Sequence, residues 1–287
     1  MRKILLLFLV IFSVFLGYSY GKDRLDRKQV QNLDGLPKST ILRFAMVADS
    51  EDDNDLLTKA LNQAKGADVN FVIGLGDLTS IGTVEQLNLA KKVFVQSGLT
   101  YHLTAGDHDL WDSRNRGEEA IGNYKRVFGD SSYSFNKEGI QFVILDNSDI
   151  YRGMSAESLE VSNKLANSTL SSPAKGEARP KRQNSKLTFV FAHKTPFHPQ
   201  SGHVMGEQTA SVYDQAERLM QLMEQKNVDG FFSGDLHFFA QFNSPGGNVK
   251  MTTVGAVNST RNFQGPRFAI VTVYNDYSWE VEDIEIH

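Results

Sequence analysis

The chain has 287 residues, of which 40% are hydrophobic and 22% charged, and its formal net charge is −4 at pH 7. This length and apolar content suffice to bury the core of one large α/β domain. The charge balance lacks the basic surplus that is typical of nucleic-acid-binding proteins. The chain contains no cysteine, which excludes disulfides and any lipid attached through cysteine.

The first 21 residues have the pattern of an export signal. Arg2 and Lys3 precede an apolar run over residues 4–16, and a small-x-small pattern follows at 19–21. The run is short for a membrane span, although an uncleaved N-terminal anchor fits the same pattern. We therefore expect export to a periplasmic or extracellular compartment, with membrane contact only through this segment. Residues 22–40 are polar and mixed in charge, which predicts a tether before a domain over 41–287.

Apolar runs alternate with amphipathic stretches in the first half of this domain, which predicts an α/β order. Strands are expected over residues 41–48 and 69–73 and in the run that stops at Gly106, with helices over 52–65 and 84–96. A helix over 118–128, a hairpin over 133–135 and 140–145, and a helix over 156–166 should follow.

Residues 168–186 are rich in Ser, Pro, Lys and Arg without an apolar period, which predicts a flexible loop. A basic clamp on an anionic substrate is the alternative, but the loop enters the next strand at the end opposite His193. The remaining chain predicts a strand over 187–192, a helix over 210–225, a strand ending at Asp235, and β runs that include 268–273 and 279–286. Early βα units followed by mostly β segments fit two sheets packed face to face with helices outside.

Five apolar runs of this domain end in Asp or His. The endings are Asp49, Asp77, the triplet Asp107-His108-Asp109, His193, and Asp235 with His237. A single Gly-Asp after a strand is usually a turn. Five such endings favour a shared site, because open α/β sheets bind ligands at the carboxyl ends of their strands and clustered carboxylates and imidazoles are typical metal ligands.

Together these endings resemble the calcineurin-like metallophosphoesterases, whose motifs run D-x-H, G-D, G-N-H-[D/E], a lone His and G-H-x-H. In this chain they stand, over about residues 42–275, as Asp49-Ser50-Glu51, Gly76-Asp77, Gly106-Asp107-His108-Asp109, His193 and Gly234-Asp235-Leu236-His237. The resemblance implies a four-layer αββα sandwich, with two mixed β-sheets flanked by helices. It also implies a two-metal site at which an activated water attacks the phosphorus of a small phosphorylated substrate.

The resemblance assigns roles by position. One metal ion would be held by Asp49, Glu51, Asp77 and His237, and the other by Asp77, Asp107, His193 and Asp235. His108 would contact the phosphate and help the leaving oxygen depart, and Asp109 would orient the His108 ring. Each position also has a structural alternative: His193 as a hydrogen-bonded surface residue, for example, or Asp235 as the cap of a turn.

Three ligand positions depart from the family pattern. Glu51 and Asp235 replace histidines, and Asp107 replaces an asparagine. All three can still donate an oxygen to a metal, which favours retuning over loss of function. With five ionised carboxylates, two divalent ions and one hydroxide, the cluster would carry about −2, against about +1 for the family pattern. We therefore expect Mn, Mg, Ca or Fe rather than Zn, and a singly charged phosphodiester rather than a dianionic monoester.

Two functions compete on this evidence. The first is an exported metal-dependent phosphoesterase, and the second is a non-catalytic metal-binding or ligand-binding module on the same fold. A structural cell-surface protein, as a third reading, has only the N-terminal segment in its favour. Further loop residues are candidate substrate contacts: Trp111, Arg114, Arg116, Arg152, His198, His203 and Arg261.

Overall fold

The computed structural model describes residues 37–167 and 186–287, which lie almost wholly in one compact unit, Thr40–His287. The expected export signal, most of the tether and all but the last residue of the loop predicted over 168–186 fall outside these ranges. Within the described ranges, no helix has both the length and the apolar character that a bilayer crossing requires.

The first of two mixed sheets has five strands in the order β11-β10-β1-β2-β3. Its strands are β1 (Thr40–Val47), β2 (Phe71–Gly74), β3 (Tyr101–Leu103), β10 (Arg267–Tyr274) and β11 (Trp279–Glu285). β2 runs parallel to both β1 and β3, while β10 is antiparallel to β1 and β11. The carboxyl ends of β1, β2 and β3 therefore meet at one edge.

The second sheet has six strands in the order β4-β5-β6-β7-β9-β8. Its strands are β4 (Tyr133–Lys137), β5 (Ile140–Ile144), β6 (Leu187–Phe191), β7 (Gly230–Ser233), β8 (Ala240–Asn243) and β9 (Lys250–Thr253). The four strands β5, β6, β7 and β9 are parallel. This sheet also gathers strand ends at one edge.

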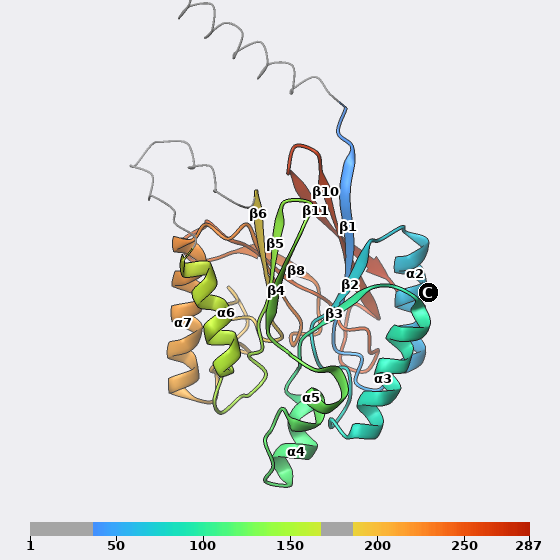
Figure 1. Cartoon of the computed structure of the whole chain (residues 1–287), viewed down its shortest axis with the longest axis vertical. Helices are drawn as coiled ribbons and strands as arrows, with labels where there is room; N and C mark the ends of the chain where they lie inside the picture. The colour runs from blue at the N-terminus through green and yellow to red at the C-terminus, as the bar shows by residue number, and fades with distance from the viewer. Residues whose placement is uncertain (1–36, 168–185) are drawn as a thin grey trace, which may run out of the picture. The chain divides into compact units, whose positions relative to one another are not determined.

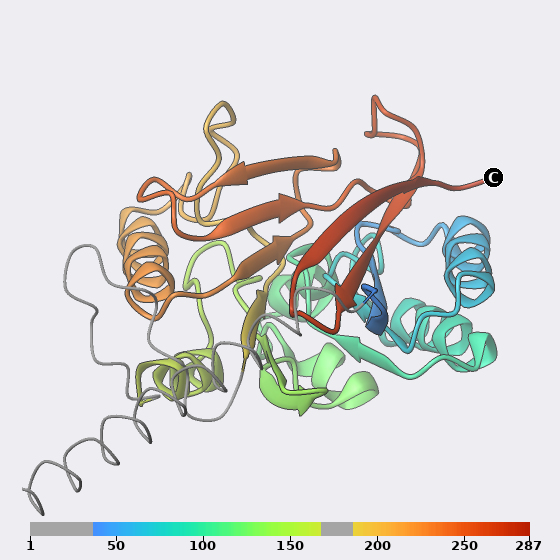
Figure 2. The same cartoon turned by 90° about the horizontal axis from the view of Figure 1, so that it is seen from above.

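Helices cover the outer faces of both sheets (Figures 1 and 2). α2 (Asn54–Gly66) and α3 (Val84–Ser97) lie on the first sheet, and α6 (Ala156–Asn167) and α7 (Ala210–Gln225) on the second. The expected four-layer αββα sandwich is confirmed. Local sequence fixes where α3 begins and ends, because Thr83 and Gln86 form a reciprocal capping box and Gly98 ends the helix in the left-handed conformation.

Phenylalanines fill the space between the two sheets. The Phe44 ring stacks on Phe71 with a centroid distance of 5.3 Å and meets Phe142 edge-on at 5.4 Å. Alternation along β1 sends Phe44 and Met46 into this layer and sends Ala45 and Val47 toward the helices. The packed layer holds the two sheets face to face, so the ligand-bearing edges of the sheets stay together.

The region after the central motif differs from expectation. Residues 108–115 form two short helices, η1 (His108–Leu110) and α4 (Trp111–Asn115), which the apolar periodicity did not predict. The helix expected from residue 118 begins later, as α5 (Gly122–Phe128). The backbone N–H of Glu118 donates to the carbonyl of Ser113 and closes the turn after α4, so this segment does not join α5.

Candidate metal centre

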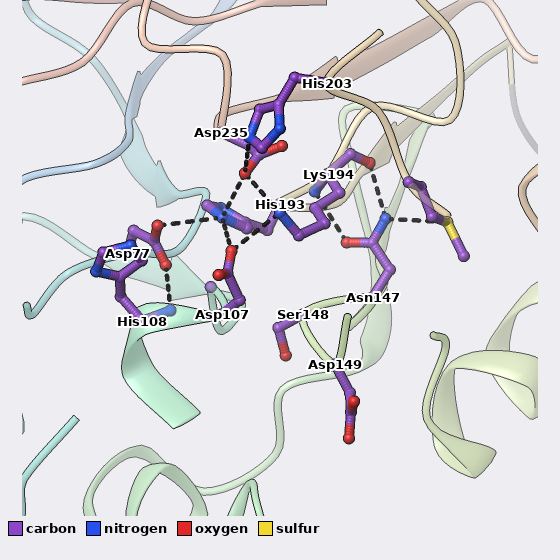
Figure 3. Close-up of polar contacts among 12 residues, drawn as sticks. Asp77, Asp107, His108, Asn147, Ser148, Asp149, His193, Lys194, His203 and Asp235 are labelled. Atoms are coloured by element: carbon purple, nitrogen blue, oxygen red, sulfur yellow. Dashed lines mark hydrogen bonds and ion pairs between the residues drawn. The ribbon is translucent and has the colours of Figure 1, made fainter. Parts of the chain in front are cut away.

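Strand ends from both sheets bring the predicted ligands together. Asp49 and Asp77 follow β1 and β2, and His193 and Asp235 follow β6 and β7. The Nε2 atom of His193 lies 3.4 Å from Asp77 Oδ2, 3.3 Å from Asp107 Oδ1 and 3.6 Å from Asp235 Oδ1 (Figure 3). Ligands about 2.1 Å from one ion are separated by about 3 to 3.5 Å, so these spacings suit a first-row metal or Mg²⁺.

The His193 ring is oriented for metal binding. Its Nδ1 lies 2.8 Å from the carbonyl oxygen of Leu75, which can only accept, so Nδ1 carries the hydrogen in the neutral ring and Nε2 carries the lone pair. His193 is fully buried, and Nε2 has no hydrogen-bond partner. Burial alone would lower the pKa of His193, but Asp77 and Asp107 raise it well above its usual range. The position therefore demands a positive charge, which a metal ion would supply.

The other side of the cluster, Asp49, Glu51 and His237, is here called the Glu51 side. His237 Nε2 lies 3.6 Å from Glu51 Oε1 and 4.0 Å from Asp49 Oδ1. Glu51 Oε1 is buried without a hydrogen bond. Burial raises the pKa of Asp49 and of Glu51, and it lowers that of His237 to about 4. Two buried carboxylates and an imidazole that resists protonation form a donor set suited to a cation.

The ligand backbones are strained. Positive φ angles occur at Asp49 (53°), Glu51 (42°), Asp77 (49°), Asp235 (66°) and His237 (62°), which are half of the ten such non-glycine residues in the described ranges. Each such residue costs about 1–3 kcal/mol, and this kind of strain concentrates at functional sites. Sequence patterns do not report this feature.

Gly106 is required by the close approach of two ligand loops. A Cβ atom at Gly106 would lie 2.1 Å from the backbone nitrogen of Asp77, and one at Gly76, where φ is 92°, would lie 2.5 Å from the nitrogen of Gly106. Glycine at position 106 is therefore required by contact with Asp77. The two glycines let the loops after β2 and β3 pack back to back.

His108 is held from three directions. Its backbone N–H donates to Asp77 Oδ1 at 2.9 Å, its ring Nδ1 lies 3.0 Å from the carbonyl oxygen of Ser80, and its ring stacks on Trp111 with a centroid distance of 3.9 Å. A ring nitrogen of His108 also lies within 4.8 Å of carboxylate oxygens of Glu51 and Asp77. Its assignment outside the metal ligands stays a prediction.

Asp109 has a different role from the expected one. Its carboxylate accepts hydrogen bonds from the backbone N–H groups of Leu78, Thr79 and Gly106 at 3.0–3.3 Å. It thereby fastens the loop after β2 to the loop after β3, whereas Ser80 and Trp111 orient the His108 ring. Burial, together with the charge of Asp77, raises the pKa of Asp109 to about 7.

Lys194 was not recognised from the sequence. Its Nζ donates to Asp235 Oδ1 at 2.6 Å and lies 3.0 Å from Asp107 Oδ1, and its side chain is 8% exposed (Figure 3). Burial would raise the pKa of both carboxyls, but Lys194 contributes to holding both well below their usual range. We call Asp107, His193, Asp235 and Lys194 the Lys194 side. The only available sequence signal was the place of Lys194 directly after His193.

Asn147 positions Lys194. Its Oδ1 accepts from the backbone N–H of Lys194 at 3.0 Å, and its Nδ2 donates to the Lys194 carbonyl at 2.7 Å. Asn147 is 1% exposed. The paired hydrogen bonds fix the segment from which the Lys194 side chain reaches the carboxylates.

The ligands open into a cavity of about 320 Å³. Of the expected substrate contacts, His203 and Arg261 line it, together with His108 and Lys194. His203 Nε2 lies 3.4 Å from Asp235 Oδ1, and this contact raises the pKa of His203 to about 9. The other expected contacts do not line it: Trp111 stacks on His108, Arg114 on Tyr151, and Arg116 pairs with Asp112 and Glu118, while His198 and Arg152 lie elsewhere.

Comparison with known proteins decides the family. Residues 42–239, more than half of the chain, match the calcineurin-like phosphoesterase family. The chain belongs to this family. A search of curated proteins returns no match.

Solved structures support the family fold. A dimetal phosphatase from Danio rerio aligns with a TM-score of 0.54 at 15% identity, over 87% of this chain and 100% of its own. A purple acid phosphatase from yellow lupin (Lupinus luteus) seeds aligns with a TM-score of 0.59 at 15% identity, over 86% of this chain and 52% of its own. GAP50, the anchor in the inner membrane complex of Plasmodium, aligns with a TM-score of 0.51 at 14% identity, over 87% of this chain and 90% of its own. At these identities the likeness concerns the fold alone.

The calcineurin-like phosphoesterase family implies a dimetal centre, and the residues of this chain fit such a centre. Atoms from three predicted ligands, Glu51 Oε1, His193 Nε2 and Asp235 Oδ2, are buried without a hydrogen-bond partner. Orphaned buried polar atoms are rare and costly in folded proteins, and the two cations of a dimetal centre would satisfy these three. The chain is therefore a metal-dependent phosphoesterase by family and by donor set.

Proposed function

We propose that this protein is an exported metal-dependent phosphoesterase that hydrolyses small phosphodiesters in preference to phosphomonoesters. One observation carries the proposal: the buried His193 Nε2, which has no hydrogen-bond partner, faces three carboxylates at 3.3–3.6 Å beside a cavity of about 320 Å³. Metal ions held there would activate water and neutralise charge on the phosphate.

The chain's own residues support the remaining chemistry. His108 lines the cavity, and its Nδ1–H can donate to the Ser80 carbonyl, so Nε2 is the nitrogen that could give a proton to the leaving oxygen when both ring nitrogens carry one. Stacking against Trp111 would keep that ring in place during the reaction. Arg261 and His203, at the cavity wall, offer positive charge to the outer phosphate oxygens.

The preference for diesters follows from the number of carboxylates. Asp49, Glu51, Asp77, Asp107 and Asp235 all belong to the cluster, and Lys194 offsets only one of their charges. A dianionic monoester would meet more repulsion here than a singly charged diester. The same oxygen-rich donor set favours Mn²⁺, Mg²⁺, Ca²⁺ or iron over zinc.

Export rests on the N-terminal segment. Its basic residues, short apolar run and small-x-small pattern are typical of a signal peptide. Mass spectrometry of the protein recovered from a secreting host tests this part: loss of about the first 21 residues is expected, and an intact cytoplasmic chain would refute it.

A non-catalytic ligand-binding module is the second candidate. It is favoured by the three altered ligand positions and by the Lys194 ammonium in contact with two of them.

Kinetics on two chromogenic substrates separate the candidates. Metal-stripped full-chain protein would be assayed with a phosphodiester and the matching monoester after addition of Mn²⁺, Mg²⁺, Ca²⁺, Fe²⁺ or Zn²⁺. We expect metal-dependent hydrolysis with a higher kcat/KM for the diester, which Asp77→Asn abolishes. Metal binding without hydrolysis would favour the module, and zinc activation with a monoester preference would refute the proposed specificity.

A further inference from the structure

Lys194 makes the two halves of the metal centre unequal. Its Nζ contacts Asp107 Oδ1 at 3.0 Å and Asp235 Oδ1 at 2.6 Å. These two oxygens are also the ones 3.3 Å and 3.6 Å from the bare Nε2 of His193 (Figure 3). The ammonium therefore already binds the oxygens of Asp107 and Asp235 that face His193 Nε2.

Both contacts of Lys194 fall on departures from the family pattern. Asp107 stands where the pattern has an uncharged asparagine, and Asp235 stands where it has a histidine. A neutral amide or imidazole gives an ammonium much weaker attraction than a carboxylate. The two replacements on this side thus create the negative charge that holds Lys194 in the cluster.

The arrangement is a built site. Lys194 is 6% exposed, Asp235 is 7% exposed, and Asn147 clamps the backbone of Lys194 through two hydrogen bonds. Asp235 Oδ1 also lies 3.4 Å from His203 Nε2, and His203 is held in turn by Glu207 at 2.9 Å. Lys194 is thus anchored at its backbone, and its side chain ends among fixed partners.

We propose that the Lys194 ammonium is a resident cation that competes with the second metal ion for Asp107 and Asp235. A metal about 2.1 Å from Asp235 Oδ1 and an ammonium at its observed position could be no more than about 5 Å apart, and repulsion at that distance is strong. The second ion must displace Lys194, so this chain binds one ion tightly on the Glu51 side and another weakly. The inference rests on the proposed metal-dependent function.

Metal titration of Lys194→Met tests the competition. Methionine is similar in length and carries no charge. Full-chain protein stripped with a chelator would be titrated with Mn²⁺ by calorimetry. We expect the wild type to bind one equivalent tightly and the second at least about 10-fold more weakly, and the variant to tighten the second step by at least about 10-fold. Lys194→Arg, which keeps the charge, should retain the weak second step.

Thermal stability gives a second readout: Lys194→Met should bind the second ion more tightly but be less stable without metal. Without metal, Lys194→Met removes the ammonium from two buried carboxylates, and Tm should fall by about 5 °C or more. With saturating Mn²⁺, the variant should gain more in Tm than the wild type. Lys125→Met, which removes a lysine that pairs with Glu157 at 3.1 Å and does not line the cavity, is the control and should change neither metal step. Lys194→Gln repeats the test if the methionine variant does not fold.

The outcomes separate this inference from the proposed function. Two tight, equal Mn²⁺ steps in the wild type, unchanged in Lys194→Met, would overturn the competition and leave the phosphoesterase standing. Unchanged metal binding with a raised KM would also overturn it and would make Lys194 a phosphate contact. No metal binding by any of the variants or the wild type would refute the proposed function and the inference together.

Discussion

The Glu51 side and the Lys194 side of one cluster solve the same electrostatic problem differently. On the Lys194 side, an ammonium 2.6 Å from Asp235 helps to hold the pKa of that carboxyl well below its usual range. On the Glu51 side, the neighbouring cation is Arg261, which is 3.8 Å away and 57% exposed, and burial raises the pKa of Glu51. Carboxylates of one chemical type thus differ in their need for a metal, because their cation neighbours differ.

Asp77→Asn should impair metal binding on both sides, because Asp77 lies between them. A neutral amide would weaken both metal positions at once, and turnover should fall by about 100-fold or more. Elemental analysis after dialysis and single-substrate kinetics measure the two effects. Normal metal content in this variant would show that Asp77 does not join the two sides.

His108→Ala should separate chemistry from metal binding. Removing a positioned acid costs about 100-fold in kcat, while both sides of the cluster keep their ligands. The matched control is His198→Ala, since His198 accepts hydrogen bonds from the backbone of Gln200 and Ser201 and does not line the cavity. If the metal content of His108→Ala falls as far as that of Asp77→Asn, His108 is a ligand of the Glu51 side.

The fold was largely predictable because its signals are local. The runs before Asp49 and Asp77 are apolar enough to identify buried strands, and the helix over residues 210–225 was predicted at its observed bounds. The short helices after Asp107 were not predictable, because they are fixed by long-range contacts such as the hydrogen bond from Asp112 N–H to the carbonyl of Ile81.

The candidate site was predictable in its residues and less so in its electrostatics. Strand-end motifs indicated Asp49, Asp77 and His193, which the fold brings together. Lys194 was not predicted, because a lone lysine after a strand matches no metal-site pattern. Its role depends on Asp107 and Asp235, which lie 41 residues or more away in the chain. Asp109 was expected to contact the His108 ring, but it accepts hydrogen bonds from backbone N–H groups instead. Its place next to His108 in the sequence does not determine where its carboxylate points.

Restoring the family pattern should make the two sides more alike. In the triple variant Glu51→His, Asp107→Asn and Asp235→His, three negative charges are lost, and monoester repulsion should fall. We expect the ratio of monoester to diester kcat/KM to rise by about 10-fold, with a shift toward zinc. Parallel kinetics with Mn²⁺ and Zn²⁺ measure this change. An unchanged ratio would mean that ligand charge does not set substrate preference.

Asn147→Ala should affect the Lys194 side alone. The variant loses both hydrogen bonds to the Lys194 backbone and leaves two buried groups unpaired, which should cost about 1–3 kcal/mol in the free energy of unfolding. Denaturant unfolding measures this loss. Mn²⁺ affinity on the Glu51 side should stay within a few-fold of wild type, and a large loss there would show that the two sides are coupled through the backbone.

His102→Phe should leave metal binding on both sides unchanged and tests the pH dependence of folding stability. The His102 ring stacks on Phe135 at 3.9 Å, and burial, with Lys137, lowers the pKa of His102 to about 4. The unfolded chain binds this proton near pH 6.5, so the folded state loses stability as pH falls from about 6.5 to 4. The variant should lack this loss, raising Tm at pH 5 relative to pH 7.5 by about 2–4 °C against wild type. Parallel acid sensitivity of both proteins would assign the loss elsewhere.

Anomalous diffraction from Mn²⁺-soaked crystals tests the central claim most directly, because it locates each ion. A strong peak is expected among Asp49, Glu51, Asp77 and His237. A weaker peak is expected beside His193, with the Lys194 side chain displaced from Asp107 and Asp235 wherever that ion is present. Absence of any peak in the cluster, or two equal peaks with Lys194 undisturbed between its carboxylates, would contradict the account.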